Sequence, residues 1–301
     1  MDYTALRVMV AVAREGNLTR AAERLHMTQP ALSLQLKKLQ HEIDLVLFER
    51  TARGMKITEA GRRLLPAAQR AVQSVSEFRA AAMGLTGVVQ GQARIGTIVD
   101  PEFLRLGGFL RHLVHLHPGL SFELQQGISG SVARLVEQGD LDVAFTLGLP
   151  GLPELQQHFH VQTLADFKYQ VIAPPGWRSK VQGKGWTELA GLPWIATPPE
   201  SVHARLLKRI YDDLGLSRHV VARVDVEASM LELVKSGVAL ALARDSLALQ
   251  LAHEAGVVVA DRVSIPATLG FICRQDRAAE PAIEAVFEVV RQVWSCGSVE
   301  V

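Results

Sequence analysis

The stretch Asn17–Asp44, NLTRAAERLHMTQPALSLQLKKLQHEID, decides how the first part of the chain folds. It predicts two short helices joined by a tight corner, and the second helix has two different faces. Apolar side chains recur along one face at helical spacing, at Leu32, Leu36, Leu39 and Ile43. Polar side chains recur beside them at Gln29, Ser33 and Lys37. A helix with a packed back and a hydrogen-bonding front suits the major groove of DNA.

The neighbouring sequence extends this head. Residues 4–14 predict a preceding amphipathic helix, and Asn17 and Thr28 are suited to cap the next two helices. Pro30 then falls in the first turn, where its missing N–H costs little. After Ile43, LVLFERTARGMKITEAG predicts two short strands around a turn, a β-wing that carries Arg50, Arg53 and Lys56. Cations on such a wing contact phosphate rather than bases, and the alternative is an ordinary solvated hairpin.

A long helix is predicted from Thr58 to about Met83. Its apolar side chains recur at three- and four-residue steps, close to a heptad seam, at Leu64, Ala68, Ala71, Val75, Phe78 and Ala82. The favoured interpretation is a dimer seam, and the alternative is packing against the rest of the same chain. Gly84, Gly87 and Gly91 then predict a linker.

Beyond Ala93 the pattern changes to strands that alternate with helices. The order βαβαβ predicts a parallel sheet with right-handed crossovers, and a second such unit follows. Asp100 is predicted to cap the first of these helices, with Pro101 at its first position. Paired crossings near 163–167 and 262–268 predict two lobes with a cleft between them. The fold class is therefore α+β with several domains.

Composition limits the function classes. The 301 residues are enough for two or three domains, and the net charge of +1 conceals an asymmetry. Residues 1–90 hold 13 Lys and Arg against 8 Asp and Glu, whereas residues 91–301 hold 19 against 23. A basic head suits a polyanion. We expect a cytoplasmic protein and no membrane partner, because no apolar run is long enough for a span and the first residues make a poor signal peptide.

The motifs of the head resemble those of the LysR-type bacterial transcriptional regulators. They are, in order, AAERL at 21–25, TQPALS at 28–33, Leu39, LFER at 47–50 and TEAG at 58–61. The resemblance covers the whole chain. It implies a winged helix-turn-helix over 1–58 and a linker or dimerisation helix and hinge over 59–90. An effector-binding domain resembling periplasmic binding proteins would fill 91–301, with lobe I at 91–163 and 268–301 and lobe II at 164–267.

The resemblance also implies which residues contact double-stranded DNA: Thr28, Gln29, Pro30, Ser33, Leu34, Lys37, Arg50 and Arg53. Gln29 suits an adenine edge, and Ser33 a base or a phosphate. Lys37 and Arg50 suit phosphate or structural contacts. Leu34 stands where many members have arginine, which argues against strong guanine readout. It either touches a thymine methyl or reads nothing specific. Gln40 and Asp44 replace the family's usual Glu and Gly and are interpreted as neutral.

A small-molecule effector is implied between the lobes, near helix N-termini. The candidate side chains follow the predicted strand ends: Thr97, Asp100, Ser129, Thr146, Thr197 and Ser201. Each has the alternative of being a cap or turn residue. A carboxylate at Asp100 that caps a helix opposes an anion there, so we expect an effector other than a simple dicarboxylate held by this turn.

Together these features predict a ligand-responsive, sequence-specific transcription regulator. The resemblance implies a homodimer through the linker helix on an inverted-repeat operator, association to a homotetramer, and RNA polymerase as a candidate partner. No cofactor, metal or enzymatic activity is expected, since the sequence has no phosphate-binding loop or nucleophile motif. His112, His115 and His117 are interpreted as surface rather than zinc ligands. The alternatives are an enzyme with an accessory head, or a pure ligand-binding module.

Overall fold

The computed structural model describes the chain except for residues 1, 26, 52–53, 85–88, 99 and 296–301. The chain divides into two compact units, Met1–Thr86 and Gly87–Val301, which are described separately.

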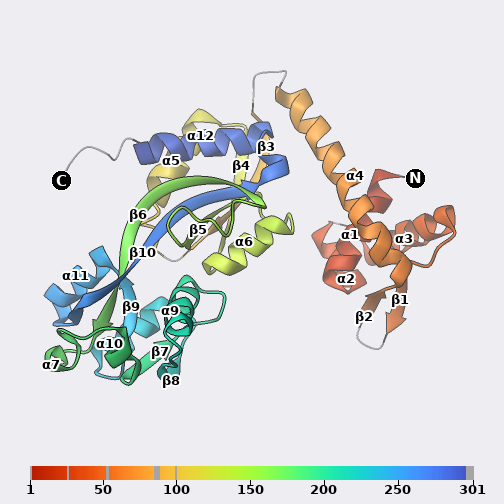
Figure 1. Cartoon of the computed structure of the whole chain (residues 1–301). Helices are drawn as coiled ribbons and strands as arrows, with labels where there is room; N and C mark the ends of the chain where they lie inside the picture. The colour runs from red at the N-terminus through yellow and green to blue at the C-terminus, as the bar shows by residue number, and fades with distance from the viewer. Residues whose placement is uncertain (1, 26, 52–53, 85–88, 99, 296–301) are drawn as a thin grey trace. The chain divides into compact units, whose positions relative to one another are not determined.

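The N-terminal unit is a three-helix head with a β-hairpin and a long helix. Its elements are α1 Tyr3–Glu15, α2 Leu18–Arg24, α3 Gln29–Ile43, β1 Phe48–Thr51, β2 Gly54–Ile57 and α4 Glu59–Gly84 (Figure 1). The predicted caps are confirmed. Asn17 Oδ1 accepts from the backbone N–H groups of Thr19 and Arg20 at 2.8 and 3.2 Å, and Thr28 Oγ1 accepts from Ala31 N at 3.4 Å. Of the predicted apolar stripe of α3, Leu32, Leu36 and Leu39 are buried in the head's core, and the partly buried Ile43 packs against it.

The hairpin is fixed to the head by backbone contacts. Met55 N donates to Gly16 O at 2.7 Å. Gly54 has φ 128°, and a Cβ there would lie 2.3 Å from Gly16 O, so this close approach requires glycine. Thr58 joins the hairpin to α4, because its hydroxyl donates to Val46 O at 2.7 Å and accepts from Gly61 N at 3.0 Å. These contacts give a physical reason for the TEAG motif.

The C-terminal unit contains a six-stranded mixed sheet in the order β4-β3-β5-β10-β6-β9 and a two-stranded sheet of β7 and β8. Its strands are β3 Gly91–Thr97, β4 Leu120–Gln126, β5 Val143–Gly148, β6 Phe159–Ala173, β7 Pro193–Ala196, β8 His219–Arg223, β9 Ala241–Arg244 and β10 Val258–Arg274. Its helices are α5 Leu106–Leu116, α6 Ser129–Glu137, α7 Arg178–Val181, α8 Trp186–Ala190, α9 Val202–Asp213, α10 Glu227–Lys235, α11 Asp245–Ala255 and α12 Pro281–Ser295, with a 3-10 turn η1 at Gln275–Arg277.

Two long antiparallel strands, β6 and β10, run through both lobes (Figure 1). They pair through the predicted crossing regions, with Ala165 opposite Leu269 and Phe167 opposite Ala267. The first lobe has the predicted parallel β3–β4 and β3–β5 pairs. The second lobe departs from the prediction, since β9 is antiparallel to β6 and only β7 and β8 form a parallel pair of strands. Helix α11 was not predicted.

The start of the first helix in this unit was predicted wrongly. Helix α5 begins at Leu106, after Arg105 at φ 49°, and not at Pro101. Asp100 instead closes a turn, since its Oδ1 accepts from Phe103 N at 2.9 Å while its own φ is 83°. Asp100 and Arg105, both with positive φ, lie between β3 and α5. The helical spacing of the apolar residues does not reveal such backbone conformations, so the prediction extended the helix too far.

Within the described ranges, no helix combines the length and the apolar character that crossing a membrane requires. The buried Cys273 has its pKa raised to about 12 by burial, which makes its thiol unreactive at neutral pH. Cys296, the other cysteine of the sequence, lies outside the described residues.

Candidate DNA-binding surface and effector cleft

The front of α3 is open to solvent while its back is packed. Leu32, Leu36 and Leu39 are at most 3% exposed, which fixes the helix against α1 and α2. Of the DNA-contact candidates on the opposite side, Thr28, Gln29, Pro30, Leu34 and Lys37 are exposed and Ser33 is partly exposed. The sequence pattern therefore placed these six side chains on one accessible surface.

Leu34 is 68% exposed. A large apolar side chain with so little packing on its own head contributes almost nothing to the stability of the head. This exposure fits a contact with an apolar partner such as the thymine methyl, but it does not identify one. The role of Leu34 in base readout stays a prediction.

Cations flank α3 on the hairpin. Arg50 and Lys56 are exposed on β1 and β2, and Lys37 is exposed on α3. Among the described residues none of the three has an ion pair, whereas Arg24, Arg62 and Arg63 are each paired with a glutamate. A cationic side chain without an ion pair in the protein is available to bind a DNA phosphate. Arg53, the predicted wing residue, lies outside the described residues.

Gln40 has a structural role that the sequence interpretation missed. Its Oε1 accepts from Leu47 N at 2.7 Å and from Phe48 N at 3.2 Å, which ties the last turn of α3 to the start of β1. An amide oxygen and a carboxylate oxygen both accept such bonds, so a glutamine can make this contact as well as a glutamate can. Gln40 thus sets the position of the hairpin relative to the recognition helix.

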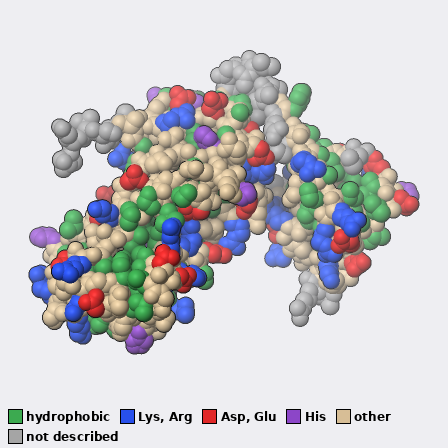
Figure 2. Space-filling view, in the orientation of Figure 1, with side chains coloured by type: hydrophobic (Ala, Val, Ile, Leu, Met, Phe, Trp, Pro, Cys, Tyr) green, Lys and Arg blue, Asp and Glu red, His purple; other side chains and the backbone are tan. Residues whose placement is uncertain are grey.

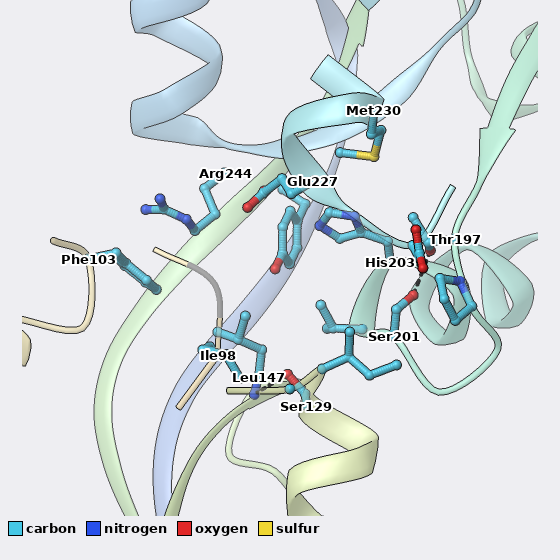
Figure 3. A pocket seen from close by; sticks show the side chains of 16 residues that line it. Ile98, Phe103, Ser129, Leu147, Thr197, Ser201, His203, Glu227, Met230 and Arg244 are labelled. Carbon is cyan, nitrogen blue, oxygen red and sulfur yellow. Dashed lines mark hydrogen bonds between the residues drawn. The ribbon is translucent and has the colours of Figure 1, made fainter. Parts of the chain in front are cut away.

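The C-terminal unit has a cleft between its two lobes. The first lobe contributes Ile98, Phe103, Ser129 and Leu147, and the second contributes Tyr169, Thr197, Ser201, His203, Glu227, Met230 and Arg244 (Figure 3). Figure 2 shows hydrophobic side chains gathered on the visible face of this unit where the lobes meet. The walls are thus mostly apolar, with a few polar groups aimed inward, as small-molecule sites are.

Three predicted effector residues line this cleft: Ser129, Thr197 and Ser201. Ser201 caps α9 by accepting from Ala204 N at 3.1 Å, and its Oγ lies 2.5 Å from Thr197 Oγ1. Ser129 Oγ accepts from Leu147 N at 3.1 Å. Ser201 therefore has the cap role that was its alternative, whereas the hydroxyls of Ser129 and Thr197 are engaged with Leu147 N and with Ser201.

The other three predicted residues lie elsewhere. Thr97 is buried, and Thr146 lies in a neighbouring hollow beside Arg134, Glu154 and Arg205. Asp100 reaches the cleft indirectly, because it forms an ion pair with Arg244, which lines the cleft from the second lobe. The pair ties the turn after β3 to the end of β9.

Sequence analysis missed the ionisable residues of the cleft, which are Tyr169, His203, Asp225, Glu227 and Arg244. Burial lowers the pKa of His203 to about 4, so its ring is neutral at pH 7 and packs at 4.7 Å against the ring of Tyr169. Burial also raises the pKa of Glu227 and lowers that of Arg244. The sequence signals that could have indicated two of these residues are the end of a strand at Arg244 and the start of a helix at Glu227.

Family models match both units. The bacterial regulatory helix-turn-helix protein model of the lysR family matches residues 3–62, and the LysR substrate binding domain model matches residues 86–295. The chain belongs to the LysR-type family of transcriptional regulators.

Curated relatives agree with this assignment. The chain is similar to the regulator CfxR of Cupriavidus necator, with 32% identity over 173 residues, 56% of this chain and 52% of that protein. It is 33% identical over 172 residues to the RuBisCO operon transcriptional regulator of Allochromatium vinosum, covering 56% of this chain and 55% of that protein. These alignments span about half the length of the relatives.

Solved full-length structures share the fold. The OxyR protein of Pseudomonas aeruginosa matches with a TM-score of 0.68 at 20% identity, over 97% of this chain and 95% of that one. CbnR complexed with its target DNA matches with a TM-score of 0.55 at 19% identity, over 97% and 99%. At these identities the likeness concerns the fold alone.

Proposed function

We propose that the chain regulates transcription by binding double-stranded DNA through α3 and the hairpin, in response to a small molecule held in the cleft of the C-terminal unit. The observation that carries the proposal is the polar, solvent-facing front of α3 on a buried leucine back, in a chain that also has the family's ligand-binding fold. Thr28, Gln29, Pro30, Ser33, Leu34, Lys37, Arg50 and Arg53 are the proposed DNA contacts.

We further propose a homodimer through α4, with two recognition helices on an inverted-repeat operator. Support comes from the length and exposure of α4. Its 26 residues extend about 39 Å at the usual helical rise. Leu64, Leu65 and Ala68 pack on the head's core, while Phe78, ten residues further, is 74% exposed. The first part of α4 thus packs on its own chain, and we propose that the part around Phe78 forms the dimer seam.

We also propose that two dimers associate into a homotetramer and that the assembly contacts RNA polymerase at the promoter. The protein works in the cytoplasm. A ligand acts by favouring one arrangement of the lobes over another, which changes the bend that the assembly imposes on DNA. The family is one of regulators, so we assign no turnover of the ligand.

The test is selection of bound sequences from a random DNA pool by the full-length protein. We expect an inverted repeat and an affinity that falls steeply with salt. Lys37→Ala should weaken binding to all sequences and reduce the salt slope by about 1, whereas Gln29→Ala should mainly relax base preference. Lys208→Ala, an exposed lysine of the C-terminal unit, is the control. Salt-independent binding, or selected sites without symmetry, would count against the proposal.

A further inference from the structure

The ionisable groups of the cleft decide which ligand charge it can accept. Besides the tyrosine, its described lining contains four such side chains: Asp225, Glu227, His203 and Arg244. His203 is neutral at pH 7, as described above. Arg244 is the single lining residue with a permanent positive charge, so its state settles whether an anion has a partner.

Arg244 is already engaged. Its Nη2 forms an ion pair with Asp100 Oδ2, and its guanidinium lies 3.9 Å from the centre of the Phe103 ring. The side chain is only 9% exposed. The negative charge of Asp100 beside the guanidinium opposes a ligand carboxylate, and displacing Asp100 would leave a partly buried acid without its partner, a costly exchange.

The helix termini at the cleft offer few free donors. At the start of α6, Ile128 N donates to Ser131 Oγ at 3.1 Å and Gly130 N donates to Glu200 O at 3.2 Å. At the start of α9, Ala204 N donates to Ser201 Oγ. Backbone N–H groups are what helix N-termini provide for anions. Here several of them are satisfied within the protein.

Glu227 is in the opposite situation. It is the first residue of α10, between Arg244 and His203 in the cleft (Figure 3). Among the described residues its carboxyl has no hydrogen bond or ion pair, although the residue is partly buried and burial raises its pKa. A partly buried carboxyl without a cation is a group that a ligand could satisfy.

We propose that the cleft accepts a ligand with a protonated amine, held by Glu227, and an apolar body that packs on Ile98, Leu147 and Met230. This inference rests on the proposed function of the cleft as the effector site. A bound amine supplies a cation beside the Glu227 carboxyl and so favours its ionised form. The hydroxyls of Ser129 and Thr197 serve as further hydrogen-bonding groups. Glu227 is then the residue that selects ligand charge.

Titration calorimetry on the full-length protein tests this with three probes of one shape: phenethylamine, 2-phenylethanol and 3-phenylpropionate. We expect the amine to bind most tightly. Glu227→Gln should weaken amine binding about tenfold or more, the scale of one charge-assisted hydrogen bond, and leave the alcohol unchanged. Glu232→Gln is the matched control, since it removes the same charge from the same helix at an exposed position paired with Lys235.

The outcomes separate the inference from the function on which it rests. Alcohol binding that survives in Glu227→Gln shows that the cleft is still folded. A preference for the carboxylate, no saturable binding of the amine, or amine binding that Glu227→Gln leaves unchanged would each overturn the ligand class while DNA binding stands. If the wild-type chain does not bind DNA specifically, the proposed regulator function is wrong, whichever of the three probes binds in the cleft.

Discussion

Asp100 shows how one carboxylate can have a function different from the one its sequence position indicates. Its place after a strand and before Pro101 predicted a helix cap that repels anions. The structure gives it Arg244 as a partner instead. The expectation of a ligand other than a simple dicarboxylate therefore stays, but its physical reason changes from repulsion at a helix end to the lack of a free cation.

We predict that Asp100→Asn makes the cleft more receptive to anions. The substitution leaves the guanidinium of Arg244 without its carboxylate, so 3-phenylpropionate should bind about tenfold more tightly than to the wild type. Calorimetry gives both affinities, and Asp212→Asn, an exposed aspartate on α9, is the control. Unchanged carboxylate affinity would mean that Arg244 does not limit anion binding.

A second buried carboxylate, Asp142, holds the C-terminal unit together. It accepts from Arg94 Nη2 and from Arg277 Nη1, both at 2.7 Å. Burial alone would raise its pKa, but the hydrogen bonds and charge of Arg94 and the charge of Arg277 lower it overall. Because the folded-state pKa is below the unfolded value, the stabilisation is present above about pH 4 and is lost as the pH falls through the folded pKa.

Asp142→Asn should therefore destabilise the unit by about 3 kcal/mol at neutral pH, the lower end for breaking a buried pair. Urea unfolding followed by tryptophan fluorescence measures this, since all four tryptophans lie in the C-terminal unit. The difference from the wild type should shrink as the pH drops below about 4. A difference independent of pH would show that packing, not charge, accounts for the loss.

At the scale of elements, periodicity predicted well wherever one face of an element packs locally. The helices of the head, their caps and the hairpin follow from spacing that spans a few residues. Helix α11 was missed because it begins directly after β9 with no turn residue between Arg244 and Asp245. The lengths of β6 and β10 were underestimated because their pairing joins residues about a hundred positions apart.

The cleft was predictable in location but only partly in composition. Ser129, Thr197 and Ser201 follow strand ends, which a sequence pattern can identify. Glu227 is at the start of a helix and Arg244 at the end of a strand. Only the topology of the second lobe places them in the same cleft as Phe103. No local pattern distinguishes such residues from ordinary surface charges, so they required the structure.

Helix α4 permits a direct test of the dimer. We predict that Phe78→Glu converts the full-length protein to a smaller species, because it places a charge in the proposed apolar seam. Light scattering during gel filtration measures the mass. Gln69→Glu, on the opposite side of the same helix, is the matched control and should leave the mass unchanged. An unchanged mass for Phe78→Glu would place the dimer contact elsewhere.

At the scale of the whole molecule, sensing and DNA binding belong to separate compact units, each with its own hydrophobic core. The head needs only local contacts for its α3 surface, whereas the cleft needs both lobes. Ligand binding in the cleft therefore has to be transmitted from one unit to the other before it can affect DNA binding.

The paired strands β6 and β10 have an evolutionary consequence. Ala173, at the end of β6, lies opposite Val258, at the start of β10, so residues 174–257 leave and re-enter the sheet at neighbouring positions. A segment with adjacent ends can be exchanged between homologues without rebuilding the rest of the fold. It contributes Thr197, Ser201, His203, Glu227 and Arg244 to the cleft. Recombination between homologues could thus give a regulator a new ligand specificity in one step. Its DNA-binding head, and so the set of genes it controls, would stay the same.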